Sequence, residues 1–230
     1  MENGAETVGD RGCRVIAVHY AAPPARPGES DRYRRWVEML GADDPLPGRP
    51  RRVVVAGTSG SGKTTVARRV GETLGIPHIE IDGLYHGSDW TPRASFLADV
   101  EVFASQPAWV TEWQYSAARD LLADRVDLMV WLDLPRRTVM RQVIRRTVHR
   151  RLRREVLWNG NVEAPLHTFF TNREHIVRWA WSGHYKSPLR VAALRERRPE
   201  LPVVRLRSRA AVNRWCAGPL RAAGGRGEGR

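Results

Sequence analysis

One short stretch of the chain has the residue types needed to hold a chain of phosphates. The pattern G-x-x-x-x-G-K-[ST] is matched at every position from Gly57 to Thr64. Glycines let the backbone curl so that its N–H groups point at phosphate oxygens, and a following helix adds the partial positive charge of its N-terminus. Lys63 is expected to reach the outer phosphates, and the Thr64 hydroxyl to bind Mg²⁺. The predicted phosphate-binding residues are Gly57, Thr58, Ser59, Gly60, Ser61, Gly62, Lys63, Thr64 and Thr65.

A carboxylate follows the next apolar run, in the stretch HIEIDGLYH. Ligands of an open parallel sheet lie beyond the carboxyl ends of its strands, so Asp82 is expected to face the same crevice as the phosphate loop. There it could accept a proton from an attacking hydroxyl group or hold Mg²⁺ through water. The alternative is that it only caps the next turn. Tyr85 and His86 follow in the same loop and are predicted to line an acceptor pocket, with simple packing as the alternative.

The stretch WVTEWQYS is predicted to end a third strand and to bring more polar side chains to the same edge. Glu112 is a candidate for holding Mg²⁺ or binding the acceptor, and a solvated carboxylate is the alternative. Gln114 and Tyr115 are predicted to contact the acceptor. The strand DLMVWLD also ends in an acid, Asp133, but the next residue is Leu134 and not the water-activating Glu of a motor ATPase. A role at the start of the next helix is therefore favoured for Asp133 over that of a Walker B acid.

The segment 134–154 carries nine arginines and no acidic residue. Such a density of like charges is unfavourable on a helix unless anions neutralise it. The arginines could close over a phosphate donor as a lid, follow a nucleic-acid backbone, or form a solvated face. Arg141, Arg145 and Arg146 are the candidates for the lid. An amphipathic helix is predicted from the four-residue repeat of Met140, Ile144, Val148 and Leu152, with Val139 and Val143 beside it.

These candidates need a scaffold that alternates strands and helices, and the sequence shows that alternation from Arg51 onward. Apolar runs predict buried strands at VVVA, HIEI, 107–112, DLMVWL and VVRL. Periodicity predicts a helix directly after the phosphate loop and others at 93–105, 116–123, 135–154, 162–182, 188–198 and 210–220. The order of elements predicts an α/β fold with three layers, in which helices cover both faces of a parallel sheet.

Three regions are expected along the chain. Residues 1–50 are rich in Gly, Pro and Ala and are predicted to form a largely flexible N-terminal extension with a short helix at 31–40. Residues 51–221 are predicted to form the α/β domain, with a lid at about 136–160. Residues 222–230 are predicted to be a disordered tail.

The net charge is +13, and the chain has 36 arginines but only two lysines, Lys63 and Lys186. A lysine kept in the phosphate loop of such a chain indicates that the position needs an ammonium group. Residues 186–230 are strongly basic as well, so nucleic acid is one expected partner. There is no apolar run of 18 residues, the N-terminus does not resemble a signal peptide, and the two cysteines are far apart. We therefore expect a cytoplasmic protein without a transmembrane helix.

From about Arg52 to Arg209 the chain resembles the P-loop kinase-like proteins known as DNA topology modulation proteins, often called adenylate kinases. The resemblance rests on GTSGSGKTT, IDGLYH, WVTEWQY, DLMVWLDLP, the arginine-rich helix, EVLWNGN and HTFFTNREHIVRWAW. It implies a five-stranded parallel sheet of order 2-3-1-4-5, ATP with Mg²⁺, and a lid. Relatives typically carry Asp-Gly-Asn-Tyr where this chain has residues 112–115, and Arg where it has Val162.

The sequence as a whole predicts an ATP- and Mg²⁺-dependent kinase that phosphorylates a small molecule, such as a nucleotide or nucleoside. In this prediction Lys63, Asp82, Glu112 and the three lid arginines take part in catalysis, and Asp82 is either a base or a metal-positioning group. The alternative is an ATP-binding protein that associates with nucleic acid, with or without ATP hydrolysis. A third hypothesis is nucleotide binding without turnover. The identity of the acceptor and the oligomeric state stay open.

Overall fold

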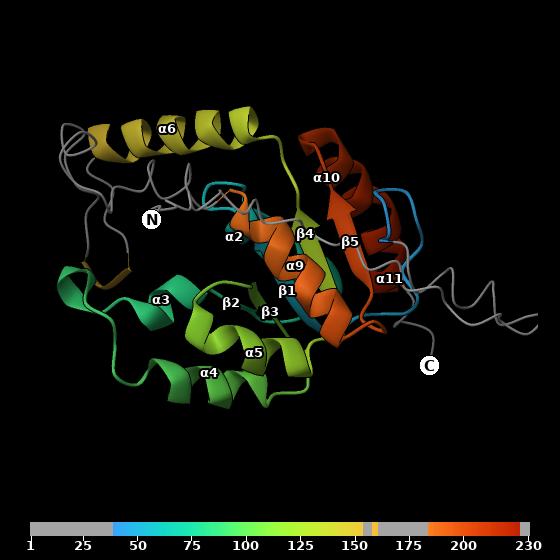
Figure 1. The fold of residues 1–230 in the computed structure, drawn as a ribbon, viewed down its shortest axis with the longest axis horizontal. Coiled ribbons are helices and arrows are strands. Elements are labelled where there is room, and N and C mark those ends of the chain that lie inside the picture. The colour runs from blue at the N-terminus through green and yellow to red at the C-terminus, as the bar shows by residue number, and fades with distance from the viewer. Residues whose placement is uncertain (1–38, 154–157, 161–183, 226–230) are drawn as a thin grey trace, which may run out of the picture.

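The computed structural model describes residues 39–153, 158–160 and 184–225 (Figure 1). Its centre is a sheet of five parallel strands in the order β2-β3-β1-β4-β5, with helices on both faces. The strands are β1 (Arg52–Gly57), β2 (His78–Ile79), β3 (Trp109–Glu112), β4 (Leu128–Leu132) and β5 (Val203–Leu206). The predicted α/β fold and the predicted strand order 2-3-1-4-5 are confirmed.

The helices follow the predicted alternation, with boundaries that differ by a few residues. They are α2 (Lys63–Leu74), α3 (Ile81–Tyr85), α4 (Phe96–Ala104), α5 (Ser116–Arg125), α6 (Arg136–Leu152), α9 (Lys186–Arg197), α10 (Arg209–Trp215) and α11 (Arg221–Gly225), together with the short turns η1 (Ser88–Trp90), η2 (Trp158–Gly160) and η3 (Cys216–Leu220). None of the helices in the described parts of the chain has the length and apolar character needed to cross a bilayer. The predicted helix at 162–182, most of the one at 31–40, and lid residues 154–157 lie outside the described residues.

The central strand β1 is buried on both faces. Val53 and Val55 pack with α2 and α10, whereas Val54 and Ala56 pack with α4, α5 and α9. All four side chains are at most 1% exposed. This explains why VVVA shows no polar alternation, and it attaches the loop that follows β1 to the buried centre of the sheet.

The segment before β1 is packed against the sheet, so the prediction of a largely flexible region was wrong for residues 39–50. The N–H of Leu40 donates to the Val203 carbonyl and the Leu40 carbonyl accepts from the N–H of Arg205, both at 2.8 Å. These bonds place Leu40 as a parallel partner beside β5. Leu46 is only 2% exposed and belongs to the core next to α2 and α10. Residues 1–38 lie outside the described part of the chain.

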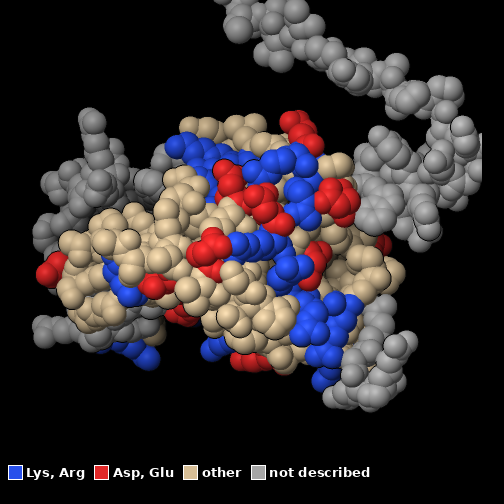
Figure 2. Space-filling model, turned by 90° about the horizontal axis from the view of Figure 1, so that it is seen from below, with Lys and Arg blue, Asp and Glu red and all other residues tan. Residues whose placement is uncertain are grey.

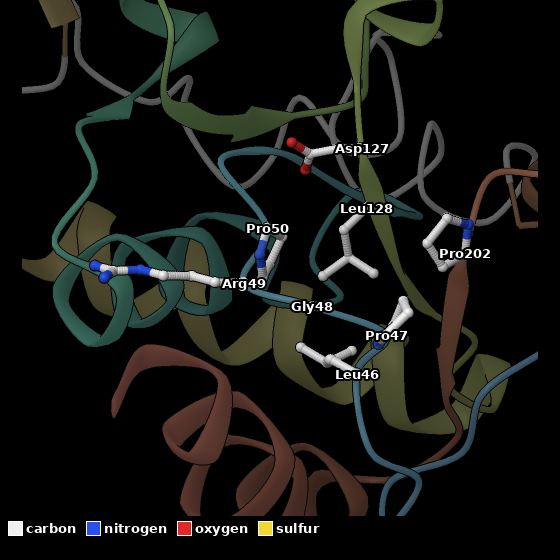
Figure 3. A pocket seen from close by; sticks show the side chains of 8 residues that line it. All are labelled: Leu46, Pro47, Gly48, Arg49, Pro50, Asp127, Leu128 and Pro202. Atoms are coloured by element: carbon white, nitrogen blue, oxygen red, sulfur yellow. The ribbon is translucent and has the colours of Figure 1, made fainter. Parts of the chain in front are cut away.

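A cavity of about 260 Å³ lies where this segment crosses the amino ends of the strands (Figure 3). Its lining residues are Leu46, Pro47, Gly48, Arg49, Pro50, Asp127, Leu128 and Pro202. The Asp127 carboxylate accepts the backbone N–H groups of Arg51 and Arg52 at 3.0–3.2 Å, which fastens the start of β1 to the start of β4. The phosphate loop follows the opposite, carboxyl end of β1, so this cavity is not part of the candidate site.

The Leu46→Ala variant should have a free energy of unfolding lower by about 2–5 kcal/mol, because it removes buried methyl groups and enlarges a cavity. Denaturant unfolding followed by circular dichroism measures the change. Leu97→Ala is the matched control, because Leu97 is 48% exposed on α4, and it should stay within about 0.5 kcal/mol of the parent protein. Equal stability of the two variants would show that residues 39–50 do not contribute to the fold.

Part of the predicted disordered tail is helical. Residues 222–225 belong to α11, where Ala223 is fully buried. Gly224 approaches α2 so closely that an added Cβ would lie 2.6 Å from the Thr73 carbonyl oxygen. A composition rich in Ala and Gly led to the prediction of disorder. The prediction was wrong for these residues because their small size allows close contact between α11 and α2. Residues 226–230 lie outside the described chain.

Candidate active site

The predicted phosphate loop joins β1 to α2. It is formed by residues 58–62, between the last residue of β1 and Lys63, where α2 begins. Gly60 and Gly62 have φ values of 80° and 96°, which L side chains rarely adopt. The N–H of Ser61 donates to the Thr58 carbonyl at 3.0 Å, and the buried Ser61 hydroxyl has no hydrogen-bond partner among the described residues. A curled, glycine-dependent loop at the start of a helix, with a buried hydroxyl in need of a partner, fits a phosphate chain.

The Lys63 side chain is 9% exposed and folds back over the loop. Its Nζ donates to the Thr58 carbonyl at 3.3 Å. Burial lowers the pKa of Lys63, the charges of Asp82 and Glu112 act to raise it, and Arg146 lowers it further. One ammonium group is therefore within electrostatic reach of two acids and one arginine from three different elements.

The sequence prediction named Thr64 and Asp82 as groups that hold Mg²⁺. Thr64 lies in the first turn of α2, directly after Lys63, and is half-buried, whereas Thr65 is exposed. Among the described residues there is no group of three His, Cys, Asp or Glu side chains that could hold a metal ion. Nucleotide-bound Mg²⁺ usually takes most of its ligands from phosphates and water, so a single hydroxyl beside the loop is compatible with it. The metal assignment stays a prediction.

The sequence predicted Asp82 at the end of a strand, but the structure places it in the first turn of α3. The strand β2 stops at Ile79, and α3 begins at Ile81. The physical reason is that the Ile81 N–H donates to the Glu112 carboxylate at 3.2 Å and does not continue the strand ladder. The strand predicted from the apolar run HIEI was therefore too long, because the edge strand ends at Ile79. Asp82 nevertheless lies close enough to the phosphate loop for its charge to affect the pKa of Lys63.

Two side chains hold one oxygen of the Asp82 carboxylate. The Tyr115 hydroxyl and the Gln114 amide both donate to Oδ1. The structure shows no hydrogen bond to Oδ2 from the described residues. Burial raises the pKa of Asp82 above its ordinary value, although the Tyr115 hydrogen bond and the Lys63 charge act in the opposite direction. His86 Nε2 lies 3.1 Å from the Tyr115 hydroxyl, so the predicted acceptor-side residues meet around a single carboxylate.

Aromatic rings support this carboxylate. Tyr85 stacks on Tyr115 with ring centroids 3.9 Å apart, and Phe96 meets both rings edge-on. Trp90 lies edge-on to His86 at 5.1 Å. Tyr115 has a φ of 57°, which is strained for a tyrosine and needs support from its surroundings. Burial raises the pKa of its hydroxyl, which keeps Tyr115 protonated as a donor to Asp82. Phe96 was missed by the sequence reasoning, because nothing in its position at a helix start indicates a site.

Glu112 is 1% exposed at the end of β3. Its Oε1 lies 3.2 Å from His78 Nε2, and its Oε2 accepts the Ile81 N–H. Burial acts to raise the pKa of Glu112, but the hydrogen bonds and the charge of His78 together hold it below its ordinary value. Both oxygens thus have partners within the protein, and the predicted contact of Glu112 with Mg²⁺ or the acceptor stays a prediction. His78 carried no signal in the sequence.

The arginine-rich helix α6 follows β4 and runs from beyond the carboxyl end of that strand away from β5 (Figure 1). Val143 touches the phosphate loop so closely that an added Cβ on Gly60 would lie 2.0 Å from its Cγ2. Of the three predicted lid arginines, Arg146 is half-buried and acts on the Lys63 pKa, whereas Arg141 and Arg145 are exposed. The face of α6 that is turned toward the phosphate loop therefore contains only one of the three predicted lid arginines, Arg146.

The buried face of α6 matches the predicted one only in part. Val139, Val143 and Thr147 are at most 2% exposed, whereas Ile144 and Val148 are 49% and 36% exposed. The predicted apolar stripe is therefore wrong at Ile144 and Val148, whereas Val139 and Val143, predicted to lie beside it, are buried. Contact with the phosphate loop at Gly60 leaves room for short branched side chains, and this local fit decides which face is turned inward.

The far end of the predicted lid meets the acceptor side. The Asn159 side-chain amide, in η2, donates to the His86 carbonyl. The lid segment therefore spans from Val143, above the phosphate loop, to Asn159, beside the residues that surround Asp82. The strand-end acid Asp133 has a different environment, because it pairs with Arg205 of β5 at 2.6 Å and with Arg207 at 3.7 Å.

A Gly60→Ala variant should be less stable by about 1–3 kcal/mol, because the alanine is strained at positive φ and its Cβ meets Val143. Thermal unfolding measures the loss, and amide hydrogen exchange in α6 should increase as this helix is displaced. Gly48→Ala is the matched control, because an added Cβ there has open space around it. Adding Val143→Ala should reverse the displacement of α6 but not the backbone strain. Unchanged exchange in Gly60→Ala would contradict the contact.

Charged side chains of both signs are mixed on the face shown in Figure 2. Arg197 of α9 pairs with Asp120 and Asp124 of α5 at 2.8 and 3.3 Å, and Arg125 of α5 pairs with Glu101 of α4. These pairs join neighbouring helices. Binding of nucleic acid stays a prediction.

Comparison with known proteins finds distant similarities to kinases. No protein-family model matches the chain. The mouse protein adenylate kinase 9 is 28% identical over 30% of this chain, which corresponds to only 4% of that protein. A gluconokinase structure from Sinorhizobium meliloti has 22% identity and a TM-score of 0.42, covering 76% of this chain and 95% of that chain. A shikimate kinase structure from Aquifex aeolicus has 12% identity and a TM-score of 0.40, covering 78% and 99%.

Such similarities do not decide an activity, and the resemblance to DNA topology modulation proteins is not confirmed by them. The α/β architecture rests on the strand order and the parallel pairing of this chain itself. The features of this chain that bear on an activity are a phosphate loop, a buried lysine and a supported carboxylate at one edge of the sheet.

Proposed function

We propose that the protein is a kinase that transfers a phosphoryl group from ATP, with Mg²⁺, to a hydroxyl or phosphate group of a small molecule. The observation that carries the proposal is the buried Lys63 ammonium, whose Nζ donates to the Thr58 carbonyl over the phosphate loop and whose pKa is lowered by burial, while the charge of Asp82 on the acceptor side acts to raise it. A phosphate donor held by the loop and an acceptor beside Asp82 would share this ammonium. The partial sequence similarity to an adenylate kinase is in keeping with this activity.

In this proposal Asp82 acts on an acceptor hydroxyl. A bond forms between the acceptor oxygen and the γ-phosphorus of ATP, the bond to the bridging β–γ oxygen breaks, and ADP leaves. The proton of the hydroxyl passes to Oδ2 of Asp82, since Oδ1 is held by Tyr115 and Gln114. The loop N–H groups and Lys63 offset charge on the phosphates, and Thr64 is the group that would bind Mg²⁺, which supplies further charge neutralisation.

The lid arginines take unequal parts in the proposed reaction. Arg146 is the one whose charge reaches Lys63, so we assign it the stabilisation of the transferring group. Arg141 and Arg145 are exposed on α6 and are proposed to act only if the lid closes further. Tyr85 and His86, which lie beside Asp82, are proposed to line the acceptor site.

Transfer of label from ATP carrying it in the γ-phosphate tests the proposal. The acceptor panel contains nucleosides, nucleotides, sugars and sugar acids, with nucleosides and nucleotides first. Label is expected on one acceptor class, together with equal formation of ADP. ADP formation that no acceptor changes, but that DNA stimulates, would overturn the proposal in favour of a nucleic-acid-associated ATPase. Tight ATP binding with no turnover under any condition would favour a nucleotide-binding protein without catalysis.

A further inference from the structure

The strand that precedes the Asp82 helix is too short to hold that helix by backbone pairing. Only His78 and Ile79 of β2 pair with β3. The chain then turns into α3 at Ile81, directly before Asp82. A two-residue edge strand supplies few hydrogen bonds, so other interactions must fix the orientation of α3 and of the carboxylate it carries.

Side chains of β3 make the connections that the backbone ladder does not. The Glu112 Oε2 accepts the Ile81 N–H at 3.2 Å, which satisfies a donor in the first turn of α3. The Thr111 hydroxyl donates to the Ile79 carbonyl at 2.7 Å. Consecutive residues of β3 therefore bind the backbone on both sides of the turn from β2 into α3.

His78 completes this arrangement from the other strand. Its Nε2 lies 3.2 Å from Glu112 Oε1, and the two side chains are 14% and 2% exposed. A carboxylate this deeply buried needs partners for both of its oxygens, and here they come from β2 and from α3. The contacts fix the rotamer of Glu112, and through Ile81 they fix the start of the helix that carries Asp82.

The same end of β3 also binds Asp82 directly. Gln114 and Tyr115, two and three residues after Glu112, donate to Asp82 Oδ1. The helix α3 is thus held at its first backbone N–H by Glu112 and at its carboxylate by the two following polar side chains. A shift of either contact would turn Oδ2 away from the position that an acceptor hydroxyl must occupy.

We infer that Glu112 and His78 are positioning residues that orient Asp82, and that Glu112 acts through the Ile81 N–H and not as a ligand of Mg²⁺. The inference rests on the proposed function, because that function gives Asp82 a reaction to serve. It assigns Glu112 a different task from the one its place at a strand end suggests, and it adds His78, whose partner lies 34 residues away in the sequence.

Two substitutions at Glu112 separate the alternatives in the full-length protein. Glu112→Gln keeps an oxygen that can accept the Ile81 N–H, whereas Glu112→Leu fills the same space without an acceptor. We expect Glu112→Leu to lower kcat about tenfold or more with KM for ATP unchanged, and Glu112→Gln to restore most of the activity. The Mg²⁺ concentration for half-maximal rate should not change in either variant. If Glu112→Gln is as inactive as Glu112→Leu and needs about tenfold more Mg²⁺, the carboxylate is a metal ligand and the inference is wrong.

A measurement without substrates keeps the inference testable if no acceptor is found or if Glu112→Leu does not fold. Amide hydrogen exchange at Ile81 should be slow in the parent protein and about tenfold faster in His78→Ala, where Glu112 loses its other partner. Glu72→Gln, at an exposed site on α2, is the matched control and should not change it. Unchanged exchange at Ile81 in His78→Ala would overturn the positioning role. If exchange at Ile81 is faster in His78→Ala but the parent protein phosphorylates no acceptor, the positioning role is supported and only the proposed kinase activity is refuted.

Discussion

Replacing Lys63 by Met should reduce phosphoryl transfer by about 10²–10³-fold or more, since it removes a buried positive charge aimed at the transferring group. The ammonium is held over the loop by the Thr58 carbonyl and has no neighbouring lysine that could replace it. Initial rates with saturating acceptor measure the effect, and calorimetric titration with ATP measures the accompanying loss of binding.

The second lysine of the chain provides a matched control for this experiment. Lys186→Met changes the only other lysine, which is exposed at the start of α9. Activity should then stay at the parent level. If Lys63→Met retained activity within about threefold of the control, the phosphate loop would not be the site of the donor. If ATP binding were lost but the parent protein showed no turnover, the loop would serve binding alone.

The Asp82→Asn variant is expected to lose about 10²–10⁴-fold in kcat while ATP binding is retained, because the amide cannot take a proton from the acceptor. The activity of the parent protein should also depend on pH. Burial raises the pKa of Asp82 above 3.8, and the base must be ionised, so kcat/KM should decline on acidification at a higher pH than for an exposed aspartate. Asp124→Asn, on an exposed part of α5, should leave both the rate and the pH profile unchanged.

The same pKa shift predicts the sign of a stability effect. An acid whose pKa is higher in the folded than in the unfolded state binds its proton more tightly when folded. Ionised Asp82 therefore weakens the folded state at neutral pH, and the weakening disappears as pH falls through the folded pKa. Asp82→Asn should be at least as stable as the parent protein at pH 7 in denaturant unfolding. A variant that is both inactive and clearly less stable would indicate that Asp82 serves mainly the fold.

The parts of the molecule that the sequence predicts well are those set by local pattern. The phosphate loop is specified by eight consecutive positions, and the buried strands β1 and β4 by continuous apolar runs. Asp82, Gln114 and Tyr115 could be placed at one edge because parallel strands bring their carboxyl ends together. That these three side chains share one hydrogen-bonded cluster follows from the structure.

What the sequence could not predict depends on partners distant in the chain. The end of β2 is decided by Glu112, and the orientation of α6 by its contact with Gly60, neither of which leaves a local pattern. The exposed Ile144 and Val148 show that a regular apolar repeat does not by itself identify the buried face of a helix. Residues 39–50 were misjudged because their Pro, Gly and Asp content describes a turn-rich path and says nothing of the backbone bonds made by Leu40.

The pairing of Leu40 with β5 has a consequence for the protein in solution. Without it, β5 would be the outermost strand of the sheet, with the N–H of Arg205 and the carbonyl of Val203 open to strands of other molecules. The short N-terminal segment occupies these groups within the same chain. A domain cut at the start of β1 would therefore be prone to self-association through β5, and a form that begins before Leu40 would keep this edge protected.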